Sequence, residues 1–193
     1  IGAFASAWAG FTFTSLPWFI LIPFCVVMGF LGGAFWAAIA GYLKARFGAH
    51  EVINTIMLNF IALALVSYLV NNIFLVPATI HTPEVSPNAQ LLRFDSFTGL
   101  FKGSPFNLSF IIALLACIFM YYLIQKTPLG YKIKTLGYNK NAAEYARMNT
   151  GKLTILSMAI AGGFAGLGGL NFVNGYKHYF ELGFTENAGY VGI

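Results

Sequence analysis

Residues 16–43 read LPWFILIPFCVVMGFLGGAFWAAIAGYL and carry no charged side chain, and this run determines the class of the fold. A helix crosses the roughly 30 Å apolar core of a bilayer with about 20 residues, so the run is long enough for one membrane span. Charged residues are absent from the whole of residues 1–43. We expect residues 1–10 to be the end of an earlier helix or part of a loop.

The rest of the chain has the same apolar character. Of its 193 residues, 58% are hydrophobic and 9% are charged, whereas charged residues make up about 25% of an average soluble domain. This composition excludes a soluble globular enzyme, a disordered tail and a nucleic-acid-binding module. Two cysteines are too few for a disulfide-stapled secreted domain, and continuous apolar runs argue against a β-barrel. The predicted fold class is all-α, a polytopic transmembrane helical bundle.

Three further apolar runs are expected to span the membrane. They comprise residues 52–76, 108–124 and 153–173. The connection 125–152 is basic, and together with residues 44–51 it holds eight of the eleven lysines and arginines. Both basic connections fall on one side of a four-span chain, and Lys and Arg near span ends are retained in the cytoplasm. We therefore predict a cytoplasmic loop at 125–152 and an external loop at 77–107.

Small residues recur every four positions in two of the predicted spans. They are Gly29, Gly33, Ala37 and Gly41 in the first span, and Gly162 and Gly166 in the last. Small residues at this spacing let two helix backbones approach closely in lipid. The pattern predicts close helix packing, with a helix pair that shifts between functional states as the alternative.

A group of polar residues opens the second predicted span and shares one face of a helix. Its members are Glu51, Asn54, Thr55 and Asn59. Polar groups are costly in contact with lipid, so this face is expected to point into the protein or into a watery cavity. Two interpretations remain open: hydrogen bonds between helices, or the lining of a polar path. Asn171 and Asn174, at the end of the last span, form a second candidate pair.

Motifs for catalysis or for metal binding are not found in the sequence. It has no P-loop and no Gly-x-Ser-x-Gly elbow. His50 and Glu51 begin like the zinc-protease pattern, but Asn54 stands where the second histidine is needed. Every acidic residue lies outside the predicted spans or at the edge of one, which argues against an intramembrane enzyme. We expect no catalytic residue and no metal site.

The basic connection contains an amphipathic segment, TPLGYKIKTLGYNKNAAEYARMNTGK, at residues 127–152. Asn139 is expected to cap a short helix that begins near Lys140. A small-residue face on that helix would consist of Ala142, Ala143 and Ala146. The segment is either an interfacial helix or a docking element for a cytoplasmic partner.

Two stretches resemble motifs of the permease subunits of ABC importers for nucleosides and simple sugars. This family also holds the ribose and branched-chain amino-acid permeases. Residues 51–59, EVINTIMLN, are the more specific of the two, and His81-Thr82-Pro83 is similar to a connection in the nucleoside-type branch. Residues 127–146 resemble the segment that docks on the ATPase subunit, although Arg147-Met148 follows where Gly-Ile is common.

The resemblance covers nearly the whole chain and implies a partial transmembrane permease domain at residues 1–193, of the ABC importer permease type and truncated at both ends. It implies a non-catalytic subunit that moves nucleosides across the bacterial cytoplasmic membrane. Simple sugars such as ribose or galactose, and then branched-chain amino acids, are the alternative substrates. A membrane scaffold without transport activity is a further alternative, but it would not need the docking segment.

The resemblance also implies partners and docking residues, while the pathway residues follow from the polar faces described above. The partners would be cytoplasmic ATP-binding subunits, a second permease subunit (identical or paralogous), an extracytoplasmic solute-binding protein and membrane lipid, with no nucleic acid. ATP would be held by the partner subunits, so this chain needs no cofactor. The expected substrate pathway consists of Asn54, Thr55, Asn59 and Asn171. The expected docking residues are Gly137, Asn139, Ala142, Ala143, Tyr145 and Ala146.

Overall fold

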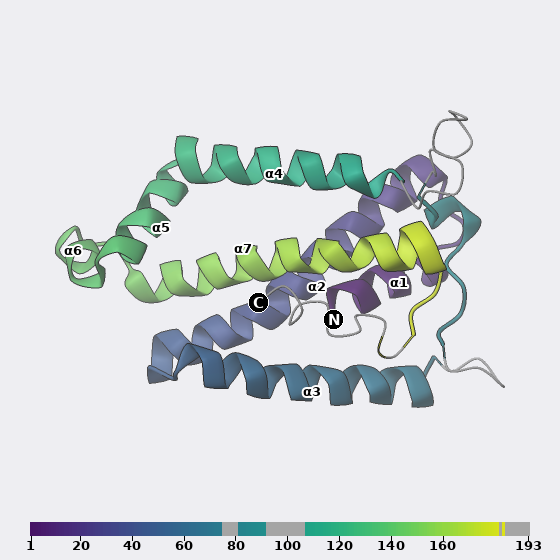
Figure 1. Cartoon of the computed structure of the whole chain (residues 1–193), viewed down its shortest axis with the longest axis horizontal. Helices are drawn as coiled ribbons and strands as arrows, with labels where there is room; N and C mark the ends of the chain where they lie inside the picture. The colour runs from purple at the N-terminus through teal and green to yellow at the C-terminus, as the bar shows by residue number, and fades with distance from the viewer. Residues whose placement is uncertain (75–80, 92–106, 182, 184–193) are drawn as a thin grey trace.

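The computed structural model describes residues 1–74, 81–91, 107–181 and 183, which form a bundle of helices (Figure 1). In chain order the elements are α1 (Gly2–Thr12), α2 (Trp18–Phe47), α3 (Glu51–Asn72), the 3-10 turn η1 (Pro87–Ala89), α4 (Ser109–Lys126), α5 (Pro128–Tyr138), α6 (Lys140–Tyr145), α7 (Thr150–Leu170) and the π-helix η4 (Asn171–Lys177).

Among the described residues, four helices are long and apolar enough to cross a membrane. They are Trp18–Phe47, Glu51–Asn72, Ser109–Lys126 and Thr150–Gly175. The predicted fold class, an all-α polytopic transmembrane bundle, is therefore confirmed. In Figure 1, α7 runs between α3 and α4 along the long axis, and α2 crosses them obliquely.

The ends of α2 and α7 lie three or four residues beyond the predicted spans because local hydrogen bonds set them. α2 continues to Phe47, where Gly48 takes a left-handed conformation (φ 62°) and donates its N–H to the carbonyl oxygen of Lys44 at 3.1 Å. α7 begins earlier than the apolar run, since the Asn149 side chain accepts a hydrogen bond from the N–H of Lys152 at 3.0 Å. Hydropathy marks the part of a helix within lipid, whereas capping residues mark its ends.

The first residues form a helix rather than a loop. α1 has 11 residues, fewer than the roughly 20 that cross a bilayer. It packs against α2 and α7 and buries Ala3, Ala7 and Ala9 almost completely. α1 therefore fills the interior of the bundle at one end of the two longer helices.

The contact between α2 and α7 is built on the recurring small residues. A Cβ atom placed on Gly33 would lie 2.2 Å from the carbonyl oxygen of Gly162, and one placed on Gly166 would lie 2.4 Å from that of Gly29. Real Cβ atoms do not approach other atoms so closely, so only glycine allows this distance between the two backbones. The prediction of close helix packing is confirmed.

The two ends of the bundle differ in structure. α5 and α6 occupy the end at the left of Figure 1, within the predicted cytoplasmic connection. At the other end, residues 81–91 run beside η4 and the residues that follow it. The N–H of Val85 donates to the backbone carbonyl oxygen of His178 at 2.7 Å. The N–H of Leu91 donates to the backbone carbonyl oxygen of Asn174 at 2.8 Å. Most of the predicted external loop 77–107 lies outside the described residues.

Candidate functional site

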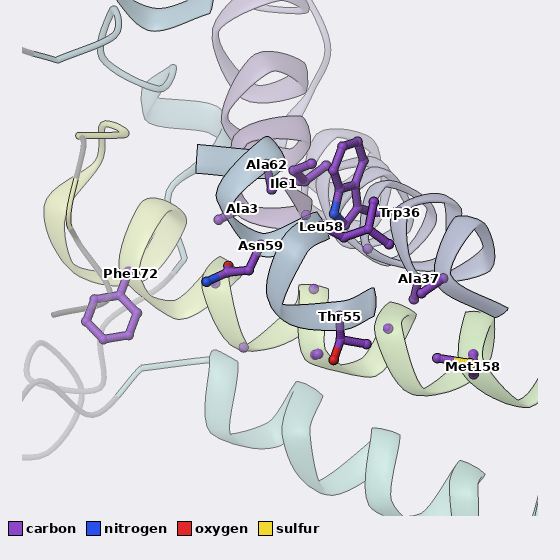
Figure 2. Close-up of a pocket in the computed structure, with 18 residues that line it drawn as sticks. Ile1, Ala3, Trp36, Ala37, Thr55, Leu58, Asn59, Ala62, Met158 and Phe172 are labelled. Carbon is purple, nitrogen blue, oxygen red and sulfur yellow. The ribbon is translucent and has the colours of Figure 1, made fainter. Parts of the chain in front are cut away.

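A cavity of about 620 Å³ lies between α1, α2, α3 and α7 (Figure 2). Small residues of α2 and α7 form much of its wall. Its larger lining side chains are Trp36, Leu58, Met158 and Phe172, and its polar ones are Thr55 and Asn59. A mostly apolar cavity with a few polar groups is typical of sites for small molecules.

Thr55 and Asn59 reach this cavity because they are four residues apart on α3 and therefore share a face. The hydroxyl of Thr55 lies within hydrogen-bond distance of two backbone carbonyl oxygens of its own helix, at 3.0 and 3.1 Å. Within the described part of the chain, the Asn59 carboxamide has no hydrogen-bond partner, and Figure 2 shows it projecting from α3 toward the side where Phe172 lies. A carboxamide offers both donors and an acceptor to a solute.

The other members of the predicted polar face turn toward α2. Asn54 does not line the cavity; its Nδ2 donates to the carbonyl oxygen of Ala40 at 3.1 Å. Glu51 forms an ion pair with Lys44 at the end of α2. The members of this face therefore have different surroundings, and the lining of a polar path stays a prediction. Asn54 and Glu51 join two helices, while Thr55 and Asn59 line a cavity.

Asn171 lies on a different side of α7 from this cavity. Its Oδ1 accepts hydrogen bonds from Asn107 Nδ2 and from the Ser109 hydroxyl, both at 2.9 Å. It lines a second cavity of about 800 Å³ between α4 and α7, which Phe164 also lines. The structure therefore does not bring Asn171 together with Thr55 and Asn59 along one wall.

A buried polar cluster joins α1, η4 and the residues around η1. Ser6 donates to Asn174 Oδ1 at 2.9 Å, and Asn174 Nδ2 donates to the carbonyl oxygen of Ala89 at 3.0 Å. The side chains of Ser6 and Asn174 are inaccessible to solvent. Ser6 could not be identified from the sequence, because a single serine among apolar residues does not show that it bonds to Asn174, 168 residues away.

The predicted docking segment is folded as two short helices. Asn139 caps α6 as expected, since its Oδ1 accepts hydrogen bonds from the N–H groups of Asn141 and Ala142 at 2.9 and 3.2 Å. Ala143, however, is completely buried within the chain. Its side chain packs α6 against the rest of this chain, and its role in docking stays a prediction.

The accessible part of this segment carries two protruding aromatic side chains. Tyr145 is 91% exposed and Tyr138 is 89% exposed. The other predicted docking residues that remain accessible are Gly137, Asn139, Ala142 and Ala146. Sequence reasoning missed Tyr138, because its exposure depends on how α5 ends against α6. Exposed tyrosines are common anchors in protein interfaces.

Comparison with known proteins identifies the family. The model of the family described as "Branched-chain amino acid transport system / permease component" matches residues 1–193. The chain is 38% identical to the nucleoside ABC transporter permease protein NupB of Lactococcus lactis subsp. cremoris, over 100% of this chain and 54% of that protein. It is 34% identical to the guanosine ABC transporter permease protein NupP of Bacillus subtilis, over 100% of this chain and 55% of that protein.

A third relative is named as a glucose permease. The glucose ABC transporter permease protein TsgB13 of Haloferax volcanii is 28% identical, over 100% of this chain and 52% of that protein. The chain thus spans about half the length of the curated relatives it matches. No solved structure matches the chain. Four apolar helices and a family match along the whole chain confirm the resemblance carried by EVINTIMLN and the docking segment. The chain is a multi-pass membrane protein and belongs to the family of branched-chain amino acid transport system permease components.

Proposed function

We propose that the chain is part of the membrane-spanning subunit of an ATP-driven importer that moves nucleosides. One observation carries this proposal. Two relatives whose names specify nucleosides and guanosine are 38% and 34% identical along the whole chain, whereas the glucose permease relative is 28% identical. The glucose relative makes simple sugars the second candidate, and the description of the family keeps branched-chain amino acids as a third.

The cavity beside Asn59 suits a solute with both a flat ring and hydroxyl groups. Trp36 and Phe172 offer aromatic surfaces on which a planar base can stack. Asn59 and Thr55 offer donors and acceptors to ring nitrogens or to ribose hydroxyls. The volume of about 620 Å³ lies within the range of pockets that hold small molecules.

The other parts of the transporter are proposals of the same kind. ATP would bind to separate cytoplasmic subunits, so this chain does no covalent chemistry and holds no cofactor. A second permease subunit would complete the pathway, and a solute-binding protein would deliver the substrate from outside. The basic end with α5 and α6 would face the cytoplasm of a bacterial cell. Switching between outward and inward states would require a bistable arrangement of the helices.

Replacing Asn59 with leucine is expected to lower nucleoside uptake about twofold to tenfold while leaving the amount of protein in the membrane unchanged. The physical reason is the loss of about one hydrogen bond to the solute, worth about 0.5–1.5 kcal/mol. The measurement is uptake of labelled nucleoside by cells that lack other nucleoside importers, in competition with unlabelled nucleosides and sugars. Asn72→Leu is the matched control, since Asn72 ends the same helix away from the cavity.

An unchanged uptake rate in Asn59→Leu would remove this cavity from the pathway. Competition by glucose or ribose, with none by nucleosides, would instead favour the sugar-permease alternative. The two results are separable, because the first concerns the site and the second concerns the substrate.

Replacing Tyr145 with alanine is expected to weaken binding of the ATPase subunits by about thirtyfold, because an aromatic residue that acts as an interface hot spot is worth about 2 kcal/mol or more. Association can be measured by co-purification of the complex, and coupling by the stimulation of ATP hydrolysis by substrate. Tyr131→Ala is the control, since Tyr131 is an exposed tyrosine of α5 outside α6. Normal association with normal stimulation in Tyr145→Ala would contradict the docking role of α6.

A further inference from the structure

A crevice of about 380 Å³ opens where the first turns of α5 and α7 meet the residues after α6. Leu129 and Lys132 line it from α5, and Lys152, Leu153 and Leu156 line it from α7. The remaining wall is formed by Ala146, Arg147, Met148 and Asn149. This crevice is separate from both cavities described above, and three of its lining residues, Leu129, Lys132 and Ala146, belong to the predicted docking segment.

Three cations line the crevice and no acidic residue does. The ion pairs among the described residues are Lys44–Glu51, Lys140–Glu144 and Lys177–Glu181. Lys132, Arg147 and Lys152 therefore have no carboxylate partner in the described part of the chain. Like charges gathered around one hollow repel one another unless an anion lies among them.

The backbone at Arg147 is held in an unfavourable conformation that keeps this residue at the crevice. Its φ of 53° is in the left-handed region, which is disfavoured for residues with a side chain. Two backbone hydrogen bonds maintain this turn. The N–H of Arg147 donates to the backbone carbonyl oxygen of Glu144 at 2.9 Å, and the N–H of Met148 donates to that of Ala143 at 3.0 Å. The N-terminus of α7, with its partial positive charge, adds to the same positive potential.

The crevice lies at the boundary between the polar and apolar parts of α7. Lys152 is the last charged residue before the apolar run, and Leu153 begins it. Leu129 and Leu156 line the same crevice and remain partly exposed, at 44% and 37%. Cationic and aliphatic side chains therefore lie next to one another along the crevice, which is the pattern expected where a charged headgroup meets the start of an acyl chain.

We propose that this crevice binds an anionic glycerophospholipid. The phosphodiester lies among Lys132, Arg147 and Lys152, and the first part of the acyl chain lies along Leu129 and Leu156. Basic pockets between membrane helices bind anionic headgroups in this way. The exposed leucines beside the cations favour a lipid over a free phosphate, because a phosphate ion would leave these apolar side chains uncovered.

The test uses the assembled transporter with its full-length permease, purified in detergent and titrated with phosphatidylglycerol or phosphatidylcholine. Bound lipid is counted by native mass spectrometry. The site variant is Lys132→Ala/Arg147→Ala/Lys152→Ala. The control variant, Lys126→Ala/Lys134→Ala/Lys140→Ala, removes the same charge from the same connection outside the crevice.

We expect the unaltered protein and the control variant to bind phosphatidylglycerol in preference to phosphatidylcholine. In the site variant the ratio of the two affinities should fall by about tenfold or more, because each cation contributes about 1 kcal/mol near an anionic surface. Equal preference in the two triple variants overturns the proposal. Binding of inorganic phosphate as tight as that of the lipid overturns it in favour of a free anion. Loss of the ATPase subunits with lipid binding intact overturns it in favour of a protein partner.

Two measurements keep the test valid if the site variant does not fold. The single change Lys152→Gln should weaken phosphatidylglycerol binding several-fold with less disturbance of the turn. The titration of the unaltered protein needs no variant, and absence of any preference for phosphatidylglycerol over phosphatidylcholine there contradicts the proposal.

Discussion

Gly162→Leu is expected to destabilise the chain strongly and to lower its yield, because α2 and α7 pack backbone against backbone at this position. A Cβ atom on Gly162 would lie 2.2 Å from the Cβ of Ala37 and 2.7 Å from the carbonyl oxygen of Gly33. Both helices would have to move apart along their contact. Overpacking typically costs about 1–3 kcal/mol and sometimes more, and native proteins are stable by only about 5–15 kcal/mol.

This contact is important because the hydrophobic effect does not drive helices together within a bilayer. Close van der Waals packing has to stabilise their association instead. The measurement is the yield of monodisperse protein in detergent together with its thermal unfolding midpoint. Gly168→Leu is the matched control on the same helix, because nothing lies within 4 Å of a Cβ atom on Gly168. We expect Gly168→Leu to retain the yield and the unfolding midpoint of the unaltered protein. Equal yields and midpoints for the two variants would contradict the packing argument.

The α2–α7 contact also shows what could be predicted from sequence. Glycines every four residues identify a helix face that accepts a close neighbour, and the structure pairs these two faces. The long apolar runs likewise identify four helices, because the length needed to cross a bilayer is fixed by its thickness. The packing of α1 could not be predicted, since a short apolar segment carries no sign of whether it spans the membrane or fills the bundle.

The polar residues show why the site was harder to predict than the fold. Helical spacing places Asn54, Thr55 and Asn59 on one face of α3. That face is wide, so Asn54 at one edge bonds to α2 while Thr55 and Asn59 line the cavity. Asn171 and Asn174 would share a face in an α-helix. They lie instead in a π-helix, whose wider turn bonds residues five apart. Asn171 therefore meets α4 while Asn174 meets α1, a divergence that spacing at 3.6 residues per turn cannot predict.

Asn174→Leu is expected to loosen residues 81–91 from the bundle and to lower the stability of the whole chain. Asn174 is 1% exposed and is the shared partner of the Ser6 hydroxyl and the carbonyl oxygen of Ala89. Leucine leaves both of these groups without that partner in an apolar interior, and each buried group left unpaired costs about 1–3 kcal/mol. π-helical turns are frequent at functional sites, so we also expect uptake to fall.

Hydrogen–deuterium exchange distinguishes this effect from a general loss of stability. In Asn174→Leu the amides of residues 82–91 should exchange faster by a larger factor than those of α2 and α7, because the lost bonds hold this segment and not the helix contact. Asn88→Leu is the matched control, since Asn88 is exposed in the same segment and its Nδ2 donates to the carbonyl oxygen of Leu16 at 3.3 Å. Uniformly faster exchange throughout the bundle, or unchanged exchange at 82–91, would contradict the role of Asn174 as the residue that fastens this segment to α1 and η4.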